Sequence, residues 1–456
     1  MDADLQIYGN ARKGEDFADS LDSSTFLFSM VMSYTATCEI PGITIAGAGP
    51  DYFKFTPPAD AEYLHYGHCR TIDGIPVTPD GKPTPALLTK VALESSSIPH
   101  LVVNAGGLVT PRLPFIETGL PSGNNIRMQD AMTMQTVANA VDYGRILGRS
   151  LAPLADCLII GESIPAGTTT AMAVLRGLGF HARVSSSMPR NPAGLKEDVI
   201  YAALSRMTGG SPDDYNGRDN DDGQNNDRSR GLNDARHRHN NKHAYGNRHN
   251  SGDATDMPGH QTGGVPHVLL GRRTAGGGGG GAPSGTVAPP DPGADPAVRQ
   301  QHLYRTVAGA GDPMIPLVAG MLSSASVSTR VMLAGGTQMA AVLAFASGIG
   351  FDDSNVAVGT TSYVAGDRDA NFAELVSRVA DVPALVVDPG LENSKHAGLR
   401  AFAEGYAKEG AGAGGCIISS MIKSGIGRAG ILRAADAEYE RLLARLSTPR
   451  PLPDRD

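Results

Sequence analysis

Residues 157–170 read Cys-Leu-Ile-Ile-Gly-Glu-Ser-Ile-Pro-Ala-Gly-Thr-Thr-Thr. The first four are apolar without polar residues between them, which predicts a strand buried on both faces, as the strands of parallel sheets are. Glycine, proline and threonine follow, and a helical pattern covers residues 166–178. An apolar strand followed by a glycine- and threonine-rich turn and a helix is the repeating unit of an α/β protein.

The same unit recurs along the chain. Short apolar runs, each followed by Gly, Thr, Asn or Asp, occur at 26–32, 101–103, 331–334, 356–358 and 384–387. Helical patterns lie near 129–147, 314–325, 337–348, 369–380 and 395–407. The sequence therefore predicts an open, mostly parallel, Rossmann-like α/β sheet flanked by helices. An amphipathic helix at 435–446 and the N-terminal segment are expected to form a small helical subdomain.

The middle of the chain has a different composition. Between Ser211 and Asp256 the one Ile, Val, Leu, Met or Phe is Leu232, and a run of glycines follows at 276–281. Such a stretch cannot bury enough apolar area to offset the entropy lost on ordering. We therefore predict three parts. They are a first part of an α/β domain at 1–208, a low-complexity, disordered insert at 209–302, and a second part with C-terminal helices at 303–456.

Charge and cysteine usage exclude several classes of protein. The 39 Lys and Arg and 47 Asp and Glu give a net charge of −8, which repels nucleic acid and anionic membranes. The N-terminus lacks a basic region followed by an apolar one, and no early apolar run approaches the roughly 20 residues that span a bilayer. The four scattered cysteines form no CxxC pair, so we expect a reduced, cytoplasmic protein without a metal site.

Glycine-rich turns follow several of the predicted strands, at 161–170, 335–338, 359–362 and 409–415. In open parallel sheets, ligands bind beyond the carboxyl ends of the strands. Glycines let backbone N–H groups approach an anion, and threonines add hydroxyl donors. The turns together predict a phosphate-binding site. None matches GxGxxG after the first strand or GxxxxGK[ST], which disfavours a dinucleotide-binding Rossmann domain and a P-loop ATPase.

Two carboxylates, Glu162 and Glu409, lie within these turns. Apolar residues and glycines surround them and few cations are near, so burial is expected to raise their pKa toward neutrality, which suits a general base. The alternative is that each accepts hydrogen bonds from backbone N–H groups at a helix end. The residues alone leave both interpretations open.

Six segments of the chain carry a family resemblance. Residues 155–169 fit a Gly-Glu-x-x-x-Gly/Ala-x-Thr-Thr loop, and residues 408–414 are similar to a Gly-Glu-Gly-x-Gly-Ala motif. Residues 125–133 resemble a Glu-x-Ala-Met-Thr segment, and residues 195–204 a lysine-bearing helix. These segments resemble segments of the nicotinate-nucleotide-dimethylbenzimidazole phosphoribosyltransferases, and they follow one another along the chain in the order found in that family. Residues 42–48 and 55–62 look closer to the archaeal-type branch of that family.

The resemblance implies an enzyme, a glycosyltransferase of the phosphoribosyltransferase class. Such an enzyme transfers 5-phosphoribose from nicotinate mononucleotide to a benzimidazole-type base. The products are nicotinate and the α-ribazole phosphate of the cobamide (vitamin B12) lower ligand. The resemblance also implies a homodimer, whereas the charge balance is what argues against nucleic-acid and membrane partners. This chemistry requires no metal or redox cofactor.

The resemblance assigns roles by motif position. Glu409 corresponds to the family's base for the incoming imidazole nitrogen, and Glu162 would lie beside the ribose and support positive charge at the anomeric carbon. Lys196 resembles the phosphate-binding lysine. The other residues implied to donate to the phosphate are Gly167, Thr168, Thr169, Thr360, Thr361, Ser362, Gly410 and Gly412, and Gly161 is implied to bind substrate. Gly335 and Gly336 replace an Asp-Gly pair of bacterial relatives and receive no role.

Two further functions stay open. One is an enzyme that uses the same nucleotide with another acceptor, such as a purine, a phenol or water. The other is a nucleotide-binding protein of cobamide metabolism that catalyses nothing. Glu409 in its glycine-rich motif favours an enzyme, because a binding protein needs no unpaired carboxylate at an acceptor site. The acceptor base itself is not determined by the sequence.

Overall fold

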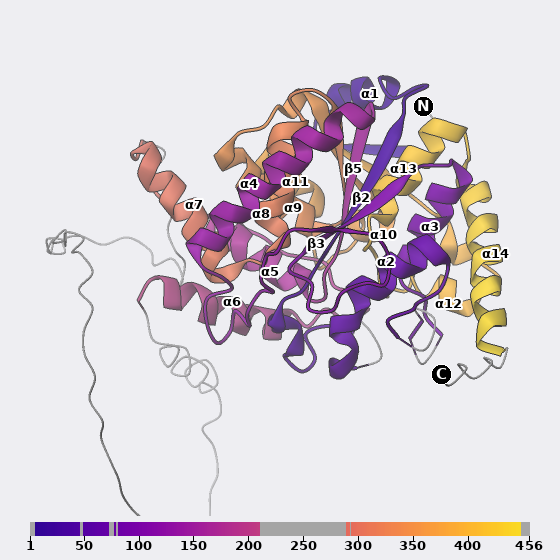
Figure 1. The fold of residues 1–456 in the computed structure, drawn as a ribbon, viewed down its shortest axis with the longest axis horizontal. Coiled ribbons are helices and arrows are strands. Elements are labelled where there is room, and N and C mark those ends of the chain that lie inside the picture. Colours follow the sequence, from indigo (N-terminus) through magenta and orange to yellow (C-terminus); the bar gives the residue numbers. More distant parts are fainter. Residues whose placement is uncertain are drawn as a thin grey trace, which may run out of the picture. The chain divides into compact units, whose positions relative to one another are not determined.

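The computed structural model describes residues 5–45, 49–72, 77–78, 81–209, 289–291 and 293–447. The chain divides into two units, residues 1–214 with 283–456, and residues 215–282. The second unit, and with it most of the insert predicted at 209–302, lies outside the described residues. The first unit is built on one sheet (Figure 1).

This sheet has eight strands in the order β1-β8-β7-β6-β5-β2-β3-β4. All neighbouring strands pair in parallel except β1, which is antiparallel to β8. The predicted open, mostly parallel α/β sheet is confirmed. The strands are β1 (Leu5–Tyr8), β2 (Phe26–Ser33), β3 (His100–Ala105), β4 (Ile116–Glu117), β5 (Cys157–Ser163), β6 (Arg330–Ala334), β7 (Val356–Thr361) and β8 (Ala384–Val387).

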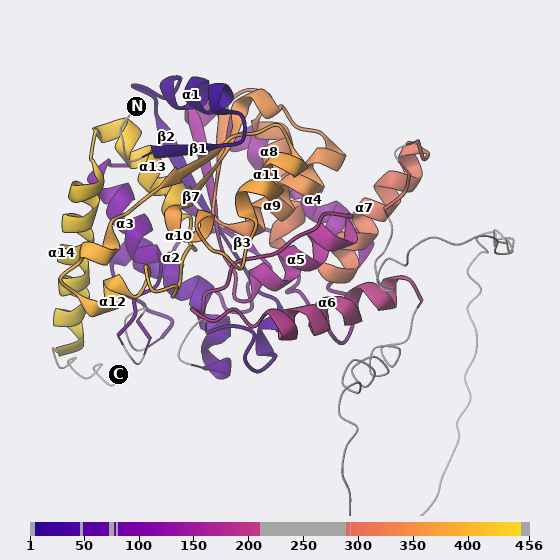
Figure 2. The same cartoon turned by 180° about the vertical axis from the view of Figure 1, so that it is seen from behind.

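Helices cover both faces of the sheet (Figures 1 and 2). Helices α4, α5, α8, α9 and α11 pack on one face, and α2, α3, α13 and α14 on the other. Their bounds are α1 (Ala11–Asp19), α2 (Thr56–Tyr66), α3 (Ala86–Ser95), α4 (Met134–Leu151), α5 (Gly167–Gly177), α6 (Ala193–Met207), α7 (Pro296–Ala310), α8 (Met314–Ala325), α9 (Thr337–Ile349), α10 (Ser362–Ala365), α11 (Phe372–Val379), α12 (Ala397–Arg400), α13 (Ala413–Ser424) and α14 (Arg428–Ser447).

The central strands are apolar on both faces because each face has its own core. In β2, Leu27 and Val31 belong to one buried cluster, whereas Phe28 and Met30 belong to the other. A strand that contributes to two cores has no polar face. This explains why the apolar runs of the sequence do not alternate with polar residues.

Three expectations require correction. The N-terminal segment does not form a helical subdomain, since β1 extends the sheet and α14 packs on α3. The helix expected at 395–407 is the four-residue α12 followed by turns, and Gly405 within them has a φ of +96°. The insert boundary at residue 302 falls within α7, which begins at Pro296. His302 of that helix contacts the Gly177 carbonyl oxygen at 3.0 Å.

Candidate active site

The turn before α13 packs closely against the ends of two central strands. A Cβ atom added to Gly161 of β5 would lie 2.8 Å from the Gly412 Cα atom. One added to Gly414 would lie 2.3 Å from the carbonyl carbon of Thr360 in β7. These distances leave no room for a side chain, so the backbones can meet only at glycines. The two motifs at 155–169 and 408–414 are therefore in contact.

The backbone of this turn is unusual. Gly410, Ala411 and Gly412 have φ values of +152°, +50° and +76°. L-amino acids rarely adopt such values, and alanine does so at a cost of about 1 kcal/mol or more. The turn lets the Ala411 amide donate to the backbone carbonyl oxygen of Glu162 at 2.8 Å. It also directs the amides of Gly410 and Gly414 toward the Glu409 carboxylate.

Glu409 is held by four donors. One carboxylate oxygen accepts from the amides of Gly410 (3.3 Å) and Gly414 (3.1 Å), and the other from the Thr361 amide (3.1 Å) and the Thr360 hydroxyl (3.3 Å). Glu409 therefore fits both interpretations, since it accepts hydrogen bonds from backbone N–H groups and its pKa is also raised. Burial outweighs the hydrogen bonds and raises its pKa to about 7.

Glu162 lies at the end of β5 and is 2% exposed. Burial raises its pKa well above the usual range, and the nearby Glu409, Asp312 and Asp60 raise it further. The Ile164 amide acts in the opposite direction by hydrogen bonding to the carboxylate. The raised pKa that the glycine-rich surroundings predicted is thus present at both glutamates.

Two further buried carboxyl groups, to which the sequence assigned no role, lie close to Glu162. Asp60 of α2 accepts from the hydroxyls of Ser163 (2.8 Å) and Thr84 (2.7 Å). Asp312 accepts from the Thr170 hydroxyl (2.5 Å) and from the first two amides of α8. Burial raises the pKa of each to about 6. In the sequence, Asp60 was marked only by its place in segment 55–62, which is one of the segments that carry the family resemblance.

Within the part of the chain that the structure describes, the four carboxyl groups of Asp60, Glu162, Asp312 and Glu409 carry no compensating cation. Among the described residues, none of them has an ion-pair partner in Lys, Arg or His. Negative charges that are buried together take up protons readily and favour a ligand with positive charge. The arrangement can therefore accept a proton near neutral pH and stabilise a cationic centre.

Lys196 occupies a second part of the site. Its side chain is buried in spite of its position on α6, and its ammonium group donates to the Thr168 hydroxyl (3.2 Å) and the Ser185 carbonyl oxygen (2.9 Å). Burial, followed by the nearby charge of Lys408, lowers its pKa to about 7. The predicted lysine and the predicted threonine at the start of α5 are thus in direct contact.

The remaining predicted substrate-binding residues form two groups, and Ser362 belongs to neither. Gly161, Gly410 and Gly412, with Thr360 and Thr361, build the contact between motifs and hold Glu409. Gly167, Thr168 and Thr169 form the first turn of α5 near Lys196, and the buried Thr169 hydroxyl has no hydrogen-bond partner among the described residues. Ser362 begins α10 and is partly exposed.

No sequence motif pointed to the buried ion pair that lies beside these residues. The Lys408 ammonium lies 2.7 Å from Asp367 Oδ2, with side-chain exposures of 9% and 7%. The Ser185 hydroxyl donates to the same oxygen at 2.8 Å. Lys408 precedes Glu409 directly, and its carbonyl oxygen accepts from the Thr361 hydroxyl. The ion pair therefore joins the surroundings of Lys196 to those of Glu409.

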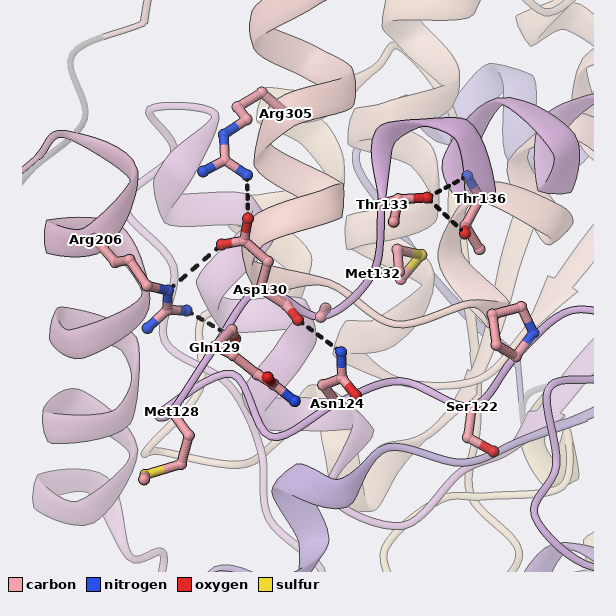
Figure 3. Close-up of a pocket in the computed structure, with 12 residues that line it drawn as sticks. Ser122, Asn124, Met128, Gln129, Asp130, Met132, Thr133, Thr136, Arg206 and Arg305 are labelled. Atoms are coloured by element: carbon pink, nitrogen blue, oxygen red, sulfur yellow. Dashed lines mark hydrogen bonds and ion pairs between the residues drawn. The ribbon is translucent and has the colours of Figure 1, made fainter. Parts of the chain in front are cut away.

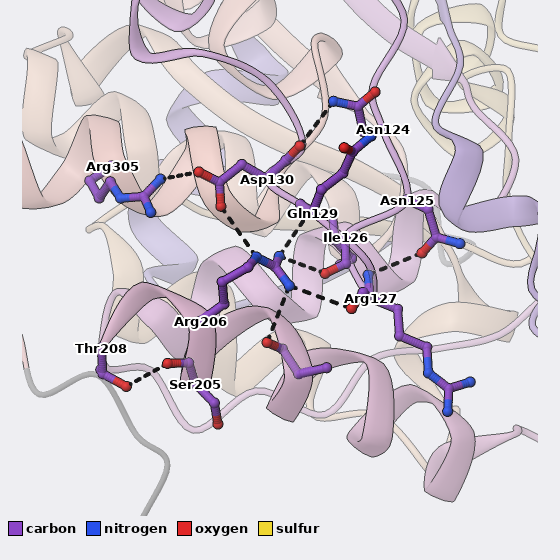
Figure 4. A network of polar contacts seen from close by, with 11 residues as sticks. Asn124, Asn125, Ile126, Arg127, Gln129, Asp130, Ser205, Arg206, Thr208 and Arg305 are labelled. Carbon is purple, nitrogen blue, oxygen red and sulfur yellow. Dashed lines mark hydrogen bonds and ion pairs between the residues drawn. The ribbon is translucent and has the colours of Figure 1, made fainter. Parts of the chain in front are cut away.

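A separate hollow of about 610 Å³ lies between the 121–136 loop and helices α6 and α7 (Figure 3). Arg206 and Arg305 line it, and both bind Asp130, at 3.4 and 2.6 Å (Figure 4). Arg206 also donates to the carbonyl oxygens of Ile126 and Gln129. The hollow therefore contains arginines already engaged in holding the loop, and neither glutamate nor Lys196 lines it.

Within the described ranges, no group of three or more His, Cys, Asp or Glu side chains is arranged to hold a metal ion. No helix of these ranges has the length and apolar character needed to cross a membrane.

Fold and site together define an α/β protein with buried carboxyl groups at the carboxyl edge of a parallel sheet. By sequence, the chain belongs to the UPF0284 family. It is 35% identical over 431 residues to the UPF0284 protein of Archaeoglobus fulgidus, covering 94% of this chain and 98% of the relative. It is 33% identical over 425 residues to that of Methanothermobacter thermautotrophicus, covering 92% of each. No family model matches the chain.

Two solved structures align with most of the chain at low sequence identity. The nicotinate-nucleotide-dimethylbenzimidazole phosphoribosyltransferase from Thermus thermophilus aligns with a TM-score of 0.46 and 14% identity, over 90% of this chain and 83% of that one. A structure of CobT from the same organism aligns with a TM-score of 0.48 and 14% identity, over 92% and 89%.

Proposed function

We propose that this protein is a phosphoribosyltransferase that moves 5-phosphoribose from nicotinate mononucleotide to a benzimidazole-type base. The single observation that carries the proposal is the contact between the two glutamate-bearing motifs. The Ala411 amide donates to the backbone carbonyl oxygen of Glu162, and both Glu162 and Glu409 have raised pKa values with no cation as partner among the described residues. Two such carboxyl groups at one strand edge suit a reaction that passes through a cationic sugar centre and ends with a proton transfer.

The chemistry makes modest demands on the protein. Nicotinate bonded through its cationic ring nitrogen is a good leaving group, because the electron pair of the breaking C–N bond neutralises the ring. The unprotonated ring nitrogen of the acceptor attacks the anomeric carbon from the opposite face with its lone pair, and the proton on the other ring nitrogen must then leave. Positioning of two substrates can supply roughly 7 to 11 kcal/mol. A well-placed base adds about 10²- to 10⁴-fold in rate.

The residues divide this work between them. Glu409 takes the proton of the acceptor ring's N–H group, and Glu162 stabilises positive charge at the anomeric carbon. Four donors hold Glu409 in one orientation. Lys196, Thr168 and the first amides of α5 bind the 5′-phosphate, since a helix N-terminus and an ammonium group both favour an anion.

The direct test is incubation of the protein with nicotinate mononucleotide and dimethylbenzimidazole, followed by chromatography. We expect released nicotinate and an equal amount of a phosphoribosylated base. Nicotinate without the coupled product would identify a hydrolase, and coupling to another base would identify a different acceptor. Bound nucleotide without turnover would identify a binding protein. The homodimer is part of the proposal and is tested by light scattering.

Matched variants test the residue roles. Glu409→Gln keeps the shape of the side chain but cannot accept the proton, so we expect turnover to fall about 10²-fold or more. Glu404→Gln changes an exposed glutamate nearby and should leave turnover unchanged. Normal turnover in Glu409→Gln would exclude this residue as the base.

A further inference from the structure

Two buried lysines are linked to the carboxylate of Asp367, one directly and the other through Ser185. Lys408 pairs directly with Asp367. Lys196 reaches the same carboxylate through Ser185, whose carbonyl oxygen accepts from Lys196 and whose hydroxyl donates to Asp367. The 185–187 and 407–408 segments are also joined by the Ala407 amide, which donates to the Ser187 carbonyl oxygen.

The charges in this cluster are not evenly matched. Asp367 neutralises Lys408, and no carboxylate among the described residues pairs with Lys196. Lys196 instead bonds to neutral oxygens of Thr168 and Ser185. A buried ammonium group with neutral partners is poised for an anionic ligand, whereas a buried paired one is not.

We propose that Asp367 is a positioning residue of the phosphate subsite. Asp367 binds Lys408 and Ser185, and it so leaves Lys196 as the cation that contacts the nucleotide phosphate. This inference rests on the proposed function, because it takes the phosphate subsite from there. It adds a residue that no motif assigns. It also gives Lys408 a role, since the neutralised Lys408 keeps its backbone bond to Thr361 and thereby the position of Glu409.

Replacing Asp367 should change phosphate affinity and turnover in opposite directions. Asp367→Asn removes a negative charge near the phosphate and frees Lys408. Affinity for the anion should rise about three- to tenfold, as expected for one charge near a partly screened anion. Turnover should fall at least about tenfold, because a freed Lys408 no longer fixes the neighbouring Glu409. A variant that had merely lost structure would lose both affinity and turnover.

A double-mutant cycle isolates the charge effect. Lys408→Met leaves Asp367 without its cation, so phosphate affinity should fall. Asp367→Asn combined with Lys408→Met restores the charge balance, and affinity should return to within about twofold of the wild-type value. As a control, Glu197→Gln removes the partner of Arg176, an ion pair that does not involve Lys196, and should leave affinity unchanged.

The experiment is calorimetric titration of the full-length variants with inorganic phosphate and with nicotinate mononucleotide, together with turnover assays. Unchanged or weaker phosphate binding by a folded Asp367→Asn, or no restoration in the double variant, would overturn the inference. Should Asp367→Asn not fold, Lys408→Arg, which keeps the pair and the affinity, is compared with Lys408→Met. Wild-type protein that binds phosphate but not the nucleotide would overturn the proposed function alone. Binding of neither would overturn both.

Discussion

The Ala411 amide donates a hydrogen bond to the backbone carbonyl oxygen of Glu162, with 2.8 Å between nitrogen and oxygen. This bond links the end of β5 to the turn that begins α13, and each of these segments carries one of the two glutamates. Because the link is made by backbone atoms, it remains when either glutamate side chain is replaced. Substitutions of the carboxyl groups should therefore test chemistry without dismantling the site.

Substitutions of the glycines at this contact should have the opposite effect. In Gly161→Ala the new Cβ atom would lie 2.8 Å from the Gly412 Cα atom and from a ring carbon of Phe28. We expect a loss of about 2 to 3 kcal/mol in the free energy of unfolding, because backbone must move to relieve the overlap. Gly194→Ala is the control, since no atom lies within 4 Å of its added Cβ. Denaturant titration of both variants decides the matter, and equal stabilities would contradict the close contact.

The pKa of Glu409 predicts opposite trends of activity and stability with pH. A base must be ionised, so kcat/KM should rise with pH and reach half its maximum near the pKa of about 7. The folded-state pKa is above the ordinary value of 4.5, so the native protein binds more protons than the unfolded chain between these values. The contribution of Glu409 to stability is therefore complete below about pH 4.5 and is lost as the pH rises through 7.

Glu409→Gln separates these trends. The amide resembles the protonated acid and does not titrate, so the stability of this variant relative to wild type should increase between about pH 5 and pH 8. Thermal unfolding measured across this range provides the comparison. A constant difference would mean that Glu409 titrates at its ordinary pKa, and the base assignment would lose its physical support.

The sequence predicted the central sheet well because its signal is local. Each buried strand needs an apolar run, and the runs at 26–32, 157–160 and 384–387 match β2, β5 and β8 closely. The edge strand β1 was missed, because Leu5–Tyr8 alternates polar and apolar residues over four positions only. The helix expected at 395–407 failed because its glycines permit turns, which the apolar pattern does not reveal.

The site was predictable only where a motif marked it. Glu162, Glu409 and Lys196 lie in such motifs. The role of Asp367 depends on Ser185 and Lys408, which come from other segments and meet only in the folded chain. The glycines show a second limit. Gly161 and Gly412 were assigned to substrate binding, yet close backbone packing already requires glycine at both positions.

The group formed by Arg206, Arg305 and Asp130 should stabilise the 121–133 loop rather than bind a ligand. Arg206 donates to Asp130 and to the carbonyl oxygens of Ile126 and Gln129. Arg206→Ala should lower the free energy of unfolding by about 2 kcal/mol and expose the loop to proteases, because several acceptors lose their donor. The exposed Arg127 provides the control, since Arg127→Ala leaves these bonds intact. Unaltered stability with lost nucleotide binding would instead identify the hollow as a ligand site.

The effect of removing the insert should depend on where the deletion ends. Residues 296–302 belong to α7, which packs on α4, α5 and α6, and His302 contacts the Gly177 carbonyl oxygen at 3.0 Å. Deleting 209–302 therefore removes the first turns of a packed helix, and we expect a measurable loss of stability. Replacing 215–282 by a short Gly/Ser linker leaves α7 whole.

This shorter deletion should leave thermal unfolding and turnover nearly unchanged. It removes the second unit, while the sheet, the carboxyl cluster and Lys196 all belong to the first. The added cost or gain from a changed loop length is small, about 0.6 kcal/mol for each doubling. Parallel measurements of both deletions are informative because they differ only at the segment ends. If the two lose stability equally, the N-terminal turns of α7 do not matter, and if the shorter deletion alone abolishes turnover, residues 215–282 contribute to the reaction.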